Sequence, residues 1–343
     1  MQHDILLDKL DHYGIRGDAL LLVKSYLSNR QQYIKMNDKV STQQLLNSSV
    51  PQGSIVGPLF FLFFINDLIS GTTNCEIQLF ADDAIVSSSN LNFNTLSEDV
   101  NSDLQIVSRW MLSNRLTLNA EKCNSIIFSN RNYQFNDILV NSSSVGNVTE
   151  CKYLGVHLDK NLNFKSHIKY ILNKTSKSCG ILYKLRHLFP TETCIRFYYA
   201  LIYPYLSYCI LIWGCTYQVH LDPLIKLQKR VVRTIAKVPR DEHTSPLFSR
   251  FNLLKLADIY NYSVAVYMFK NKNNFSSNNH TYGTRNRNQL VSMYHRLTQT
   301  QKSISFMGPK IWNELPAEIR EIDCINVFKK SVKNWYSRNY LLS

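Results

Sequence analysis

The sequence of 343 residues predicts an α+β fold, with helices and short antiparallel strands in the first half and helices alone in the second. Two observations predict it. Short apolar runs bounded by turn residues recur before residue 159, while the apolar spacing from Lys165 to Lys237 is helical. We expect four parts: a partial antiparallel sheet with helices (1–158), a basic helical region (159–270), a flexible polar segment (271–303) and a C-terminal helical region (304–343).

The chain opens on two predicted helices, from Met1 to Tyr13 and from Asp18 to Ser28, followed by short strands at 32–35 and 44–50. A further helix is predicted from Pro58 to Leu68. Because it is apolar at almost every position, we expect most of its sides to be buried.

The step into this helix is Val50-Pro51-Gln52-Gly53-Ser54. Pro51 fixes the backbone, whereas Gly53 allows another molecule to approach closely. Core packing explains the phenylalanines of the helix, but it does not explain the Gln-Gly-Ser step.

Two adjacent carboxylates, Asp82 and Asp83, stand between two apolar runs that are predicted to be short buried strands. Asp-Asp is typical of turns, so the pair should lie at the tip of a hairpin. Two carboxylates held together oppose double ionisation unless a cation neutralises them. Mg²⁺ binds such oxygen ligands and keeps positions open for substrate phosphates. The alternative, a solvated turn with two surface acids, is the commoner meaning of an isolated pair.

After the hairpin, Thr95-Leu96-Ser97-Glu98 predicts a capping box that starts a helix ending near Asn114. Short strands are then expected at Ser125–Phe128 and Lys152–Val156, before the charge balance changes.

Charge is divided unevenly along the chain. Residues 1–158 carry 11 Lys and Arg against 15 Asp and Glu, net −4, whereas residues 159–343 carry 28 against 10, net +18. Such a basic half suits a polyanionic partner. One group recurs every three or four residues, which places most of it on one helix face, where it could contact phosphates or form a plain solvated surface: Lys226, Lys229, Arg230, Arg233 and Lys237.

The eight cysteines include no C-x-x-C pair and no disulfide framework, which predicts free thiols in a reducing compartment. Cys209 and Cys215, with His157 and His167, match no zinc spacing. The uncharged run 197–214 approaches membrane-spanning length, but Pro204 and five tyrosines favour a broken core helix. No signal peptide is recognised. We expect a soluble intracellular protein, nuclear or cytoplasmic.

Six landmarks in order resemble the reverse transcriptase of non-long-terminal-repeat (LINE-like) retrotransposons of the jockey kind. They are His3-Asp4-Ile5-Leu6-Leu7 with Tyr13-Gly14-Ile15, Tyr26-Leu27-Ser28-Asn29-Arg30, Val50 to Ser54 through Asn66-Asp67-Leu68, Phe80-Ala81-Asp82-Asp83, Asn119 to Lys122, and Tyr153-Leu154-Gly155. Gly308 to Asn313 and Leu315-Pro316 resemble the C-terminal region of the same family. Each landmark is weak by itself, but the ordered set is specific and covers essentially the whole chain.

The resemblance implies a polymerase palm in residues 1–158 and a thumb formed by the basic helices that follow. Asp82 and Asp83 would bind the catalytic metal ions, Mg²⁺ or Mn²⁺, and Lys122 would approach the triphosphate and protonate the leaving pyrophosphate. The remaining implied sites are the nucleotide and template site (Gln52, Gly53, Ser54, Phe80, Ala81), the primer grip (Tyr153, Leu154, Gly155) and the thumb's contacts to the nucleic-acid backbone (Lys226, Lys229, Arg230, Arg233).

The implied partners are an RNA template, a DNA primer and deoxynucleoside triphosphates, with no membrane and no specific protein partner. The family pattern also has a catalytic carboxylate on a strand before the His3-Asp4 landmark, and a fingers subdomain, and neither is matched here. Asp4 and Asp8 fall on a predicted helix and do not replace that carboxylate. No endonuclease or ribonuclease H constellation is recognised.

We therefore expect a member of the family that is inactive alone, since losing ~4 kcal/mol of transition-state stabilisation slows a reaction about a thousandfold. The alternative is a non-catalytic nucleic-acid-binding remnant of a transposable element. An interaction protein without a nucleic-acid role ranks last.

Overall fold

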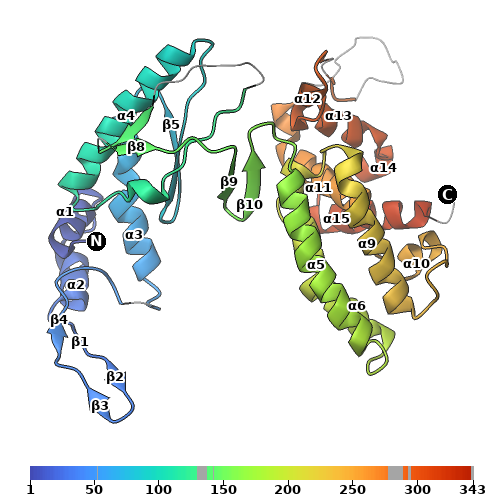
Figure 1. The fold of residues 1–343 in the computed structure, drawn as a ribbon, viewed down its shortest axis with the longest axis horizontal. Helices are drawn as coiled ribbons and strands as arrows, with labels where there is room; N and C mark the ends of the chain where they lie inside the picture. The colour runs from blue at the N-terminus through green and yellow to red at the C-terminus, as the bar shows by residue number, and fades with distance from the viewer. Residues whose placement is uncertain (52, 130–136, 142, 277–288, 293–294, 341–343) are drawn as a thin grey trace. The chain divides into compact units, whose positions relative to one another are not determined.

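The computed structural model describes residues 1–51, 53–129, 137–141, 143–276, 289–292 and 295–340. The chain forms two compact units, Met1–Thr149 and Glu150–Ser343 (Figure 1). The first unit combines helices with short antiparallel strand pairs, and the second is helical after one hairpin. The predicted α+β class is therefore confirmed.

Three helices pack together at the start of the first unit: α1 (His3–His12), α2 (Gly17–Leu27) and α3 (Gly57–Ile65). Their shared core contains buried leucines and phenylalanines, as the helical spacing predicted. The prediction that α3 is buried on most sides was wrong, because Leu59 and Leu62 are 49% and 53% exposed. Phe60 and Phe64 bury one face of α3, and the opposite face remains in solvent within the described residues.

The strands between α2 and α3 are shorter than predicted. β1 (Gln31–Gln32) pairs with β4 (Gln44–Leu45), and β2 (Lys35–Met36) pairs with β3 (Lys39–Val40), both antiparallel. All of these strand residues are exposed, so the pairs contribute little to the core.

The rest of the first unit consists of hairpins that pack on one long helix, α4 (Phe93–Ser113). A 3₁₀ helix, η1 (Asn66–Gly71), leads from α3 into the hairpin of β5 (Glu76–Phe80) and β6 (Asp83–Ser87). The second hairpin, β7 (Ile138–Val140) with β8 (Ser143–Val145), packs on α4 beside η2 (Ala120–Lys122).

Four predictions for this region need correction. The two strands beside the acidic pair are not buried, because Ile77 is the single buried residue of β5 and β6. The described strands form separate two-stranded pairs and not one sheet. Asn92, not the predicted capping box, caps α4, and its side chain accepts a hydrogen bond from the backbone N–H of Asn94. Ser125–Phe128 forms only an isolated bridge, between Ser125 and Asn147.

The second unit opens on a hairpin, β9 (Glu150–Tyr153) with β10 (Val156–Asp159), which packs on α5 (Lys165–Leu185). The uncharged run then forms three short pieces, α6 (Thr191–Leu201), α7 (Tyr203–Ser207) and α8 (Ile210–Trp213), so the predicted broken core helix is confirmed. Within the described part of the chain, no helix has both the length and the apolar character needed to cross a membrane.

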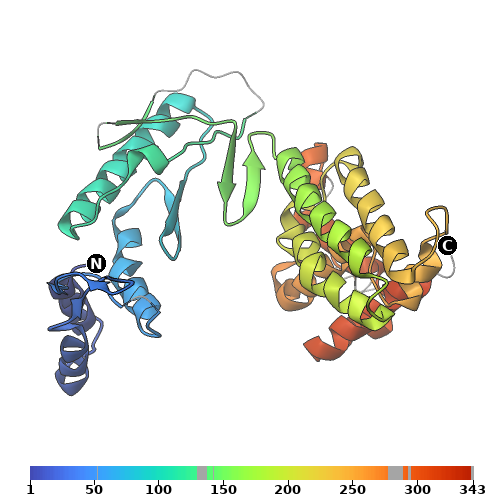
Figure 2. The same ribbon diagram turned by 60° about the horizontal axis from the view of Figure 1, so that its bottom comes forward.

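Helix α9 (Gln218–Ala236) lies beside α5 along its length, as both views show (Figures 1 and 2). The two helices run parallel, because Thr216 Oγ1 donates to Asn163 O near their starts and Lys237 Nζ donates to Phe189 O near their ends. One large core around Trp213, Val231 and Phe328 includes residues of α10 (Ser245–Arg250), α11 (Leu256–Asn271), α13 (Ile304–Glu314), α14 (Ala317–Arg320) and α15 (Ile325–Asn339). The short elements η3 (Lys272–Asn274) and α12 (Thr298–Gln301) lie between α11 and α13 in the chain.

Part of the polar segment 271–303, which was expected to be flexible, lies outside the described residues, namely 277–288 and 293–294. The described part includes η3 and α12. Leu290 is held by Asn313, whose side chain exchanges two hydrogen bonds with the Leu290 backbone at 2.9 and 3.0 Å.

Candidate metal and nucleic-acid sites

The acidic pair occupies the tip of the β5–β6 hairpin, as the sequence predicted. Phe80 pairs with Asp83 at the end of the ladder, which leaves Ala81 and Asp82 as the turn. Ala81 has φ +52°, a region that residues other than glycine rarely adopt. Asp82 and Asp83 are both exposed, and no described residue forms a hydrogen bond or ion pair with either carboxylate. Two adjacent acids therefore face solvent, and no cationic side chain among the described residues neutralises them.

A buried carboxylate on α4 holds the base of this hairpin. Asp103 accepts hydrogen bonds from the backbone N–H groups of Cys75 at 2.7 Å, Asn74 at 2.9 Å and Thr73 at 3.4 Å. Burial by itself would raise the pKa of Asp103, but these three donors outweigh it and lower the pKa. No local sequence signal points to this residue, because Asp103 belongs to a helical pattern and its partners are about thirty positions earlier.

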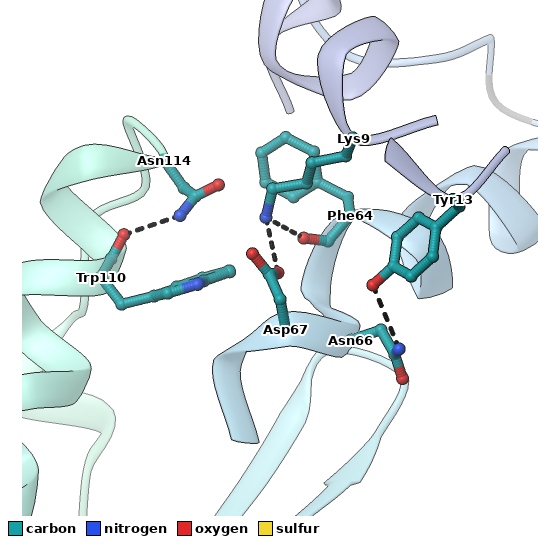
Figure 3. A network of polar contacts seen from close by, with 7 residues as sticks. All are labelled: Lys9, Tyr13, Phe64, Asn66, Asp67, Trp110 and Asn114. Atoms are coloured by element: carbon teal, nitrogen blue, oxygen red, sulfur yellow. Dashed lines mark hydrogen bonds and ion pairs between the residues drawn. The ribbon is translucent and has the colours of Figure 1, made fainter. Parts of the chain in front are cut away.

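A second contact that the sequence analysis missed joins α1 to η1 and α4 (Figure 3). Lys9 Nζ donates to Asp67 Oδ1 and to Phe64 O, each at 2.6 Å. It also lies 4.5 Å from the ring centroid of Trp110 and 4.8 Å from that of Phe64. Tyr13 of the first landmark reaches the same region, because its hydroxyl accepts a hydrogen bond from Asn66 Nδ2 at 3.1 Å. Two landmarks of the sequence thus meet in space.

The Gln-Gly-Ser step is described in part. Gln52 lies outside the described residues. Gly53 has φ +82°, and a Cβ added there would meet nothing within 4 Å, so the backbone conformation and not crowding favours glycine. Ser54 Oγ accepts a hydrogen bond from Gly57 N at 2.9 Å and closes the turn before α3. Ser54 thus has a structural role in addition to the one that the resemblance implies.

Lys122 ends η2 and is exposed. Four residues earlier, Leu118 packs both against the core below the β5–β6 hairpin and against the β7–β8 core. The segment that carries Lys122 is therefore anchored beside the hairpin of the acidic pair.

The predicted primer-grip turn is a tight hairpin of the second unit. Tyr153 pairs with Val156, and Leu154 and Gly155 both have positive φ, +43° and +83°, as type I′ turns require. Tyr208 holds this turn, because its hydroxyl donates to Leu154 O at 2.6 Å. A Cβ added at Gly155 would lie 3.3 Å from the Tyr208 ring, so glycine meets a steric and a backbone requirement together.

The predicted basic face of α9 is exposed. Lys226, Lys229 and Arg230 point to solvent, opposite the buried face of the helix. Arg233 is half-buried, and its Nε donates to Glu242 O at 2.7 Å. The face includes one acid, Asp222, which accepts a hydrogen bond from Gln218. Three cations of α9 are therefore available for phosphates.

The structure brings only some of the predicted site residues together. Phe80, Ala81, Asp82 and Asp83 share the acidic hairpin. No hydrogen bond, ion pair or ring contact between described residues joins this hairpin to Ser54 or to Lys122. The roles of those two residues remain predictions, as do those of the Tyr153–Gly155 turn.

The chemistry of the acidic pair fits a divalent cation. Carboxylate oxygens are the ligands that Mg²⁺ and Mn²⁺ prefer, and Mg²⁺ is commonly held by one or two carboxylates together with waters and substrate phosphates. Both carboxylates are exposed and unpaired among the described residues. The described residues contain no group of three His, Cys, Asp or Glu side chains placed to share an ion.

Residues 1–158 match the family model described as "Reverse transcriptase (RNA-dependent DNA polymerase)". This region holds the acidic hairpin, Ser54 and Lys122. This region is therefore similar to reverse transcriptases, and the LINE-like resemblance stated from the landmarks is confirmed.

The relatives come from mobile elements of flies. The chain is 24% identical over 269 residues to the "RNA-directed DNA polymerase from mobile element jockey" of Drosophila funebris, a match that covers 73% of this chain and 29% of that protein. It is 25% identical over 282 residues to the "Probable RNA-directed DNA polymerase from transposon X-element" of Drosophila melanogaster, covering 80% of this chain and 30% of the relative. The matches thus span less than a third of these relatives.

Proposed function

We propose that this chain takes part in RNA-directed DNA synthesis, with the β5–β6 hairpin in the palm of the polymerase and the helices of the second unit as its thumb. The observation that carries the proposal is the exposed Asp82–Asp83 pair at the tip of a hairpin, inside the region that matches the family. The proposed substrates are an RNA template, a DNA primer and deoxynucleoside triphosphates.

In this proposal Asp82 and Asp83 hold the divalent cation, Mg²⁺ or Mn²⁺. When bound, the metal supplies charge stabilisation for the phosphates and activation of the primer hydroxyl. Phe80, 61% exposed beside the acids, offers a ring face to a base, and the backbone at Ala81 fixes the direction of the turn.

The other residues bind and orient the substrates. The Lys122 ammonium meets the phosphates and can donate a proton to the leaving pyrophosphate. Gln52, Gly53 and Ser54 contact the nucleotide and template, while the Tyr153–Gly155 turn, fixed by Tyr208, supports the primer end. Lys226, Lys229 and Arg230 bind the phosphates of the RNA–DNA duplex, and Arg233, whose Nε donates to Glu242 O, lies beside them on α9.

The test is primer extension on an RNA template with Mg²⁺. Because the described residues supply two carboxylates and no third, we expect the chain alone to extend a primer about a thousandfold more slowly than a complete site. Any product should vanish in Asp82→Ala and persist in Asp38→Ala, an exposed turn acid of the same unit. Product that survives Asp82→Ala would contradict the proposed site.

A second candidate function is nucleic-acid binding without catalysis, favoured by the three exposed cations on α9. It predicts salt-sensitive duplex binding, no extension product and no divalent cation at the acidic turn. Absence of duplex binding at low salt would exclude this candidate.

A further inference from the structure

A cavity of about 170 Å³ in the second unit is lined mainly by tyrosines. Its walls come from α6, α7, α11, α15 and the loop before α11. We propose that this cavity binds one unpaired nucleotide of a nucleic-acid strand, with the base against the tyrosine rings and the phosphate at the lysine. The lining residues are Tyr198, Tyr199, Tyr203, Leu254, Tyr262 and Lys333.

The rings are arranged to accept another ring. The centroids of Tyr199 and Tyr203 lie 5.3 Å apart at 59°, and those of Tyr198 and Tyr199 lie 5.4 Å apart at 79°. Tyr198 is 1% exposed and closes the inner end of the cavity, whereas Tyr199 is 36% exposed at its open side. Tilted aromatic groups leave ring faces and edges available for a base, and stacking of this kind is the usual way proteins hold unpaired bases.

Lys333 supplies a charge at the open side. Its Nζ donates to the Tyr199 hydroxyl at 3.1 Å and lies 5.5 Å from the ring centroid. It has no acidic partner among the described residues, and α15 carries no Asp or Glu. Lys329 and Lys330 precede it by one helical turn and extend the positive surface. A phosphate next to the bound base would meet these charges.

The size of the cavity limits the ligand. Sites for drug-sized molecules usually measure about 300–1,000 Å³, so 170 Å³ suits a single ring system. Bases inside a duplex already use both faces for stacking, and only an unpaired base can offer one to the tyrosines.

The cavity is distinct from the basic face of α9. Gln228, on the buried side of that helix, donates to the hydroxyl of Tyr198 at 3.0 Å, at the inner end of the cavity. Lys226 and Lys229 emerge on the opposite side of α9. Single-strand capture in the cavity therefore neither uses nor blocks the proposed duplex contacts, and it requires no chemistry at Asp82.

The test uses the full chain with short single-stranded RNA and DNA that each carry one 2-aminopurine, a base whose fluorescence falls on stacking. Wild type should quench this fluorescence. Tyr199→Ala should abolish the quenching and weaken binding about five- to a hundredfold, whereas Tyr199→Phe should retain both. Lys333→Ala should weaken binding but preserve the quenching of bound strand. Whether the fluorescence of the RNA strand, of the DNA strand or of both is quenched shows which kind of strand supplies the bound nucleotide.

Tyr183→Ala is the matched control, because Tyr183 is a 47% exposed tyrosine on α5 that does not line the cavity. It should bind like wild type. The proposal is overturned if Tyr199→Ala quenches like wild type, or if Tyr199→Ala and the control Tyr183→Ala weaken binding equally. It is also overturned if a strand with an abasic site binds as tightly as the intact strand. Should Tyr199→Ala lose its helical circular dichroism, Tyr199→Phe and Lys333→Ala decide the question, and wild-type binding by Lys333→Ala overturns it.

Discussion

Lys9 Nζ lies 2.6 Å from Asp67 Oδ1, and this ion pair joins the first helix of the chain to the 3₁₀ helix that leads into the acidic hairpin. Lys9 is 15% exposed and Asp67 43%, so solvent screens the pair only in part. Because the same ammonium also contacts Phe64 O and the Trp110 ring, it connects α1 to three other elements of the first unit, namely η1, α3 and α4.

Lys9→Met should weaken this connection. We expect a loss of about 1–2 kcal/mol in the local opening free energy of α1, since hydrogen bonds to a charged group and a cation–π contact are removed while the partners stay partly solvated. Hydrogen–deuterium exchange of the α1 amides measures it. Arg16→Met is the control, because the Arg16–Asp11 pair is exposed at both ends and should contribute at most about 0.5 kcal/mol. Equal effects of the two variants would contradict the role assigned to Lys9.

Asp103→Asn should loosen the base of the acidic hairpin by about 1.5–3 kcal/mol at pH 7, because three backbone N–H groups lose a charged acceptor. The pKa of Asp103 is lowered in the folded protein. Its stabilisation is therefore complete above the unfolded-state pKa of about 3.9 and is lost as the pH falls through the folded-state pKa.

Amide exchange of Asn74 and Cys75 at several pH values tests this prediction. The difference between wild type and Asp103→Asn should shrink below about pH 4. Glu98→Gln, an exposed position earlier on α4, should leave the exchange unchanged. A difference that is independent of pH would mean that the charge of Asp103 does not matter.

We expect the second unit to lose stability in mild acid because of His167. Burial, followed by the nearby His157, lowers the pKa of His167 to about 4, and its Nε2 is buried with no hydrogen-bond partner among the described residues. The groups around it are His157, Tyr170 and Trp213, with Glu150 bound to His157. Because the folded-state pKa lies below the unfolded value of about 6.5, stability is full above pH 6.5 and falls by up to about 3 kcal/mol toward pH 4.

Thermal unfolding at pH 7 and pH 4.5 measures this loss. In His167→Phe the unfolding temperature should fall less between pH 7 and pH 4.5 than in wild type, although the variant also loses the hydrogen bond from His157 N. The same fall in both proteins would assign the acid sensitivity to other groups.

The basic face of α9 should dominate the salt dependence of duplex binding. Replacing Lys226, Lys229 and Arg230 with glutamine removes up to three phosphate contacts, so the slope of log affinity against log salt should become shallower by up to about 3. A control with the same charge change replaces the exposed Lys24, Lys35 and Lys39 of the first unit. If the control lowers the slope as much as the α9 variant, total charge and not this face governs binding.

Features that depend on neighbouring residues could be predicted from the sequence. Asp82 stands at a hairpin tip because an acidic turn separates two strand patterns, and the run with Pro204 breaks into short helices because proline interrupts the backbone bonding. The exposed cations of α9 follow from their spacing.

Features that depend on tertiary contacts could not be predicted. The sequence predicted a capping box at Thr95, whereas Asn92 caps α4 three residues earlier in the structure. The exposure of α3 and of the acidic hairpin depends on which of their faces pack against other elements of the fold. The cavity of Tyr199 and Lys333 joins residues 134 positions apart, and no local signal links them.

The central claim is that Asp82 and Asp83 bind a divalent cation, and Mn²⁺ titration followed by nuclear magnetic resonance tests it most directly. Paramagnetic broadening should begin at the amides of residues 80–84. It should disappear from them in the double variant Asp82→Asn, Asp83→Asn. The adjacent exposed acids Asp241 and Glu242 provide an internal comparison within the same chain. Broadening at 241–242 that equals or exceeds that at 80–84, or broadening at 80–84 that persists in the double variant, would contradict the claim.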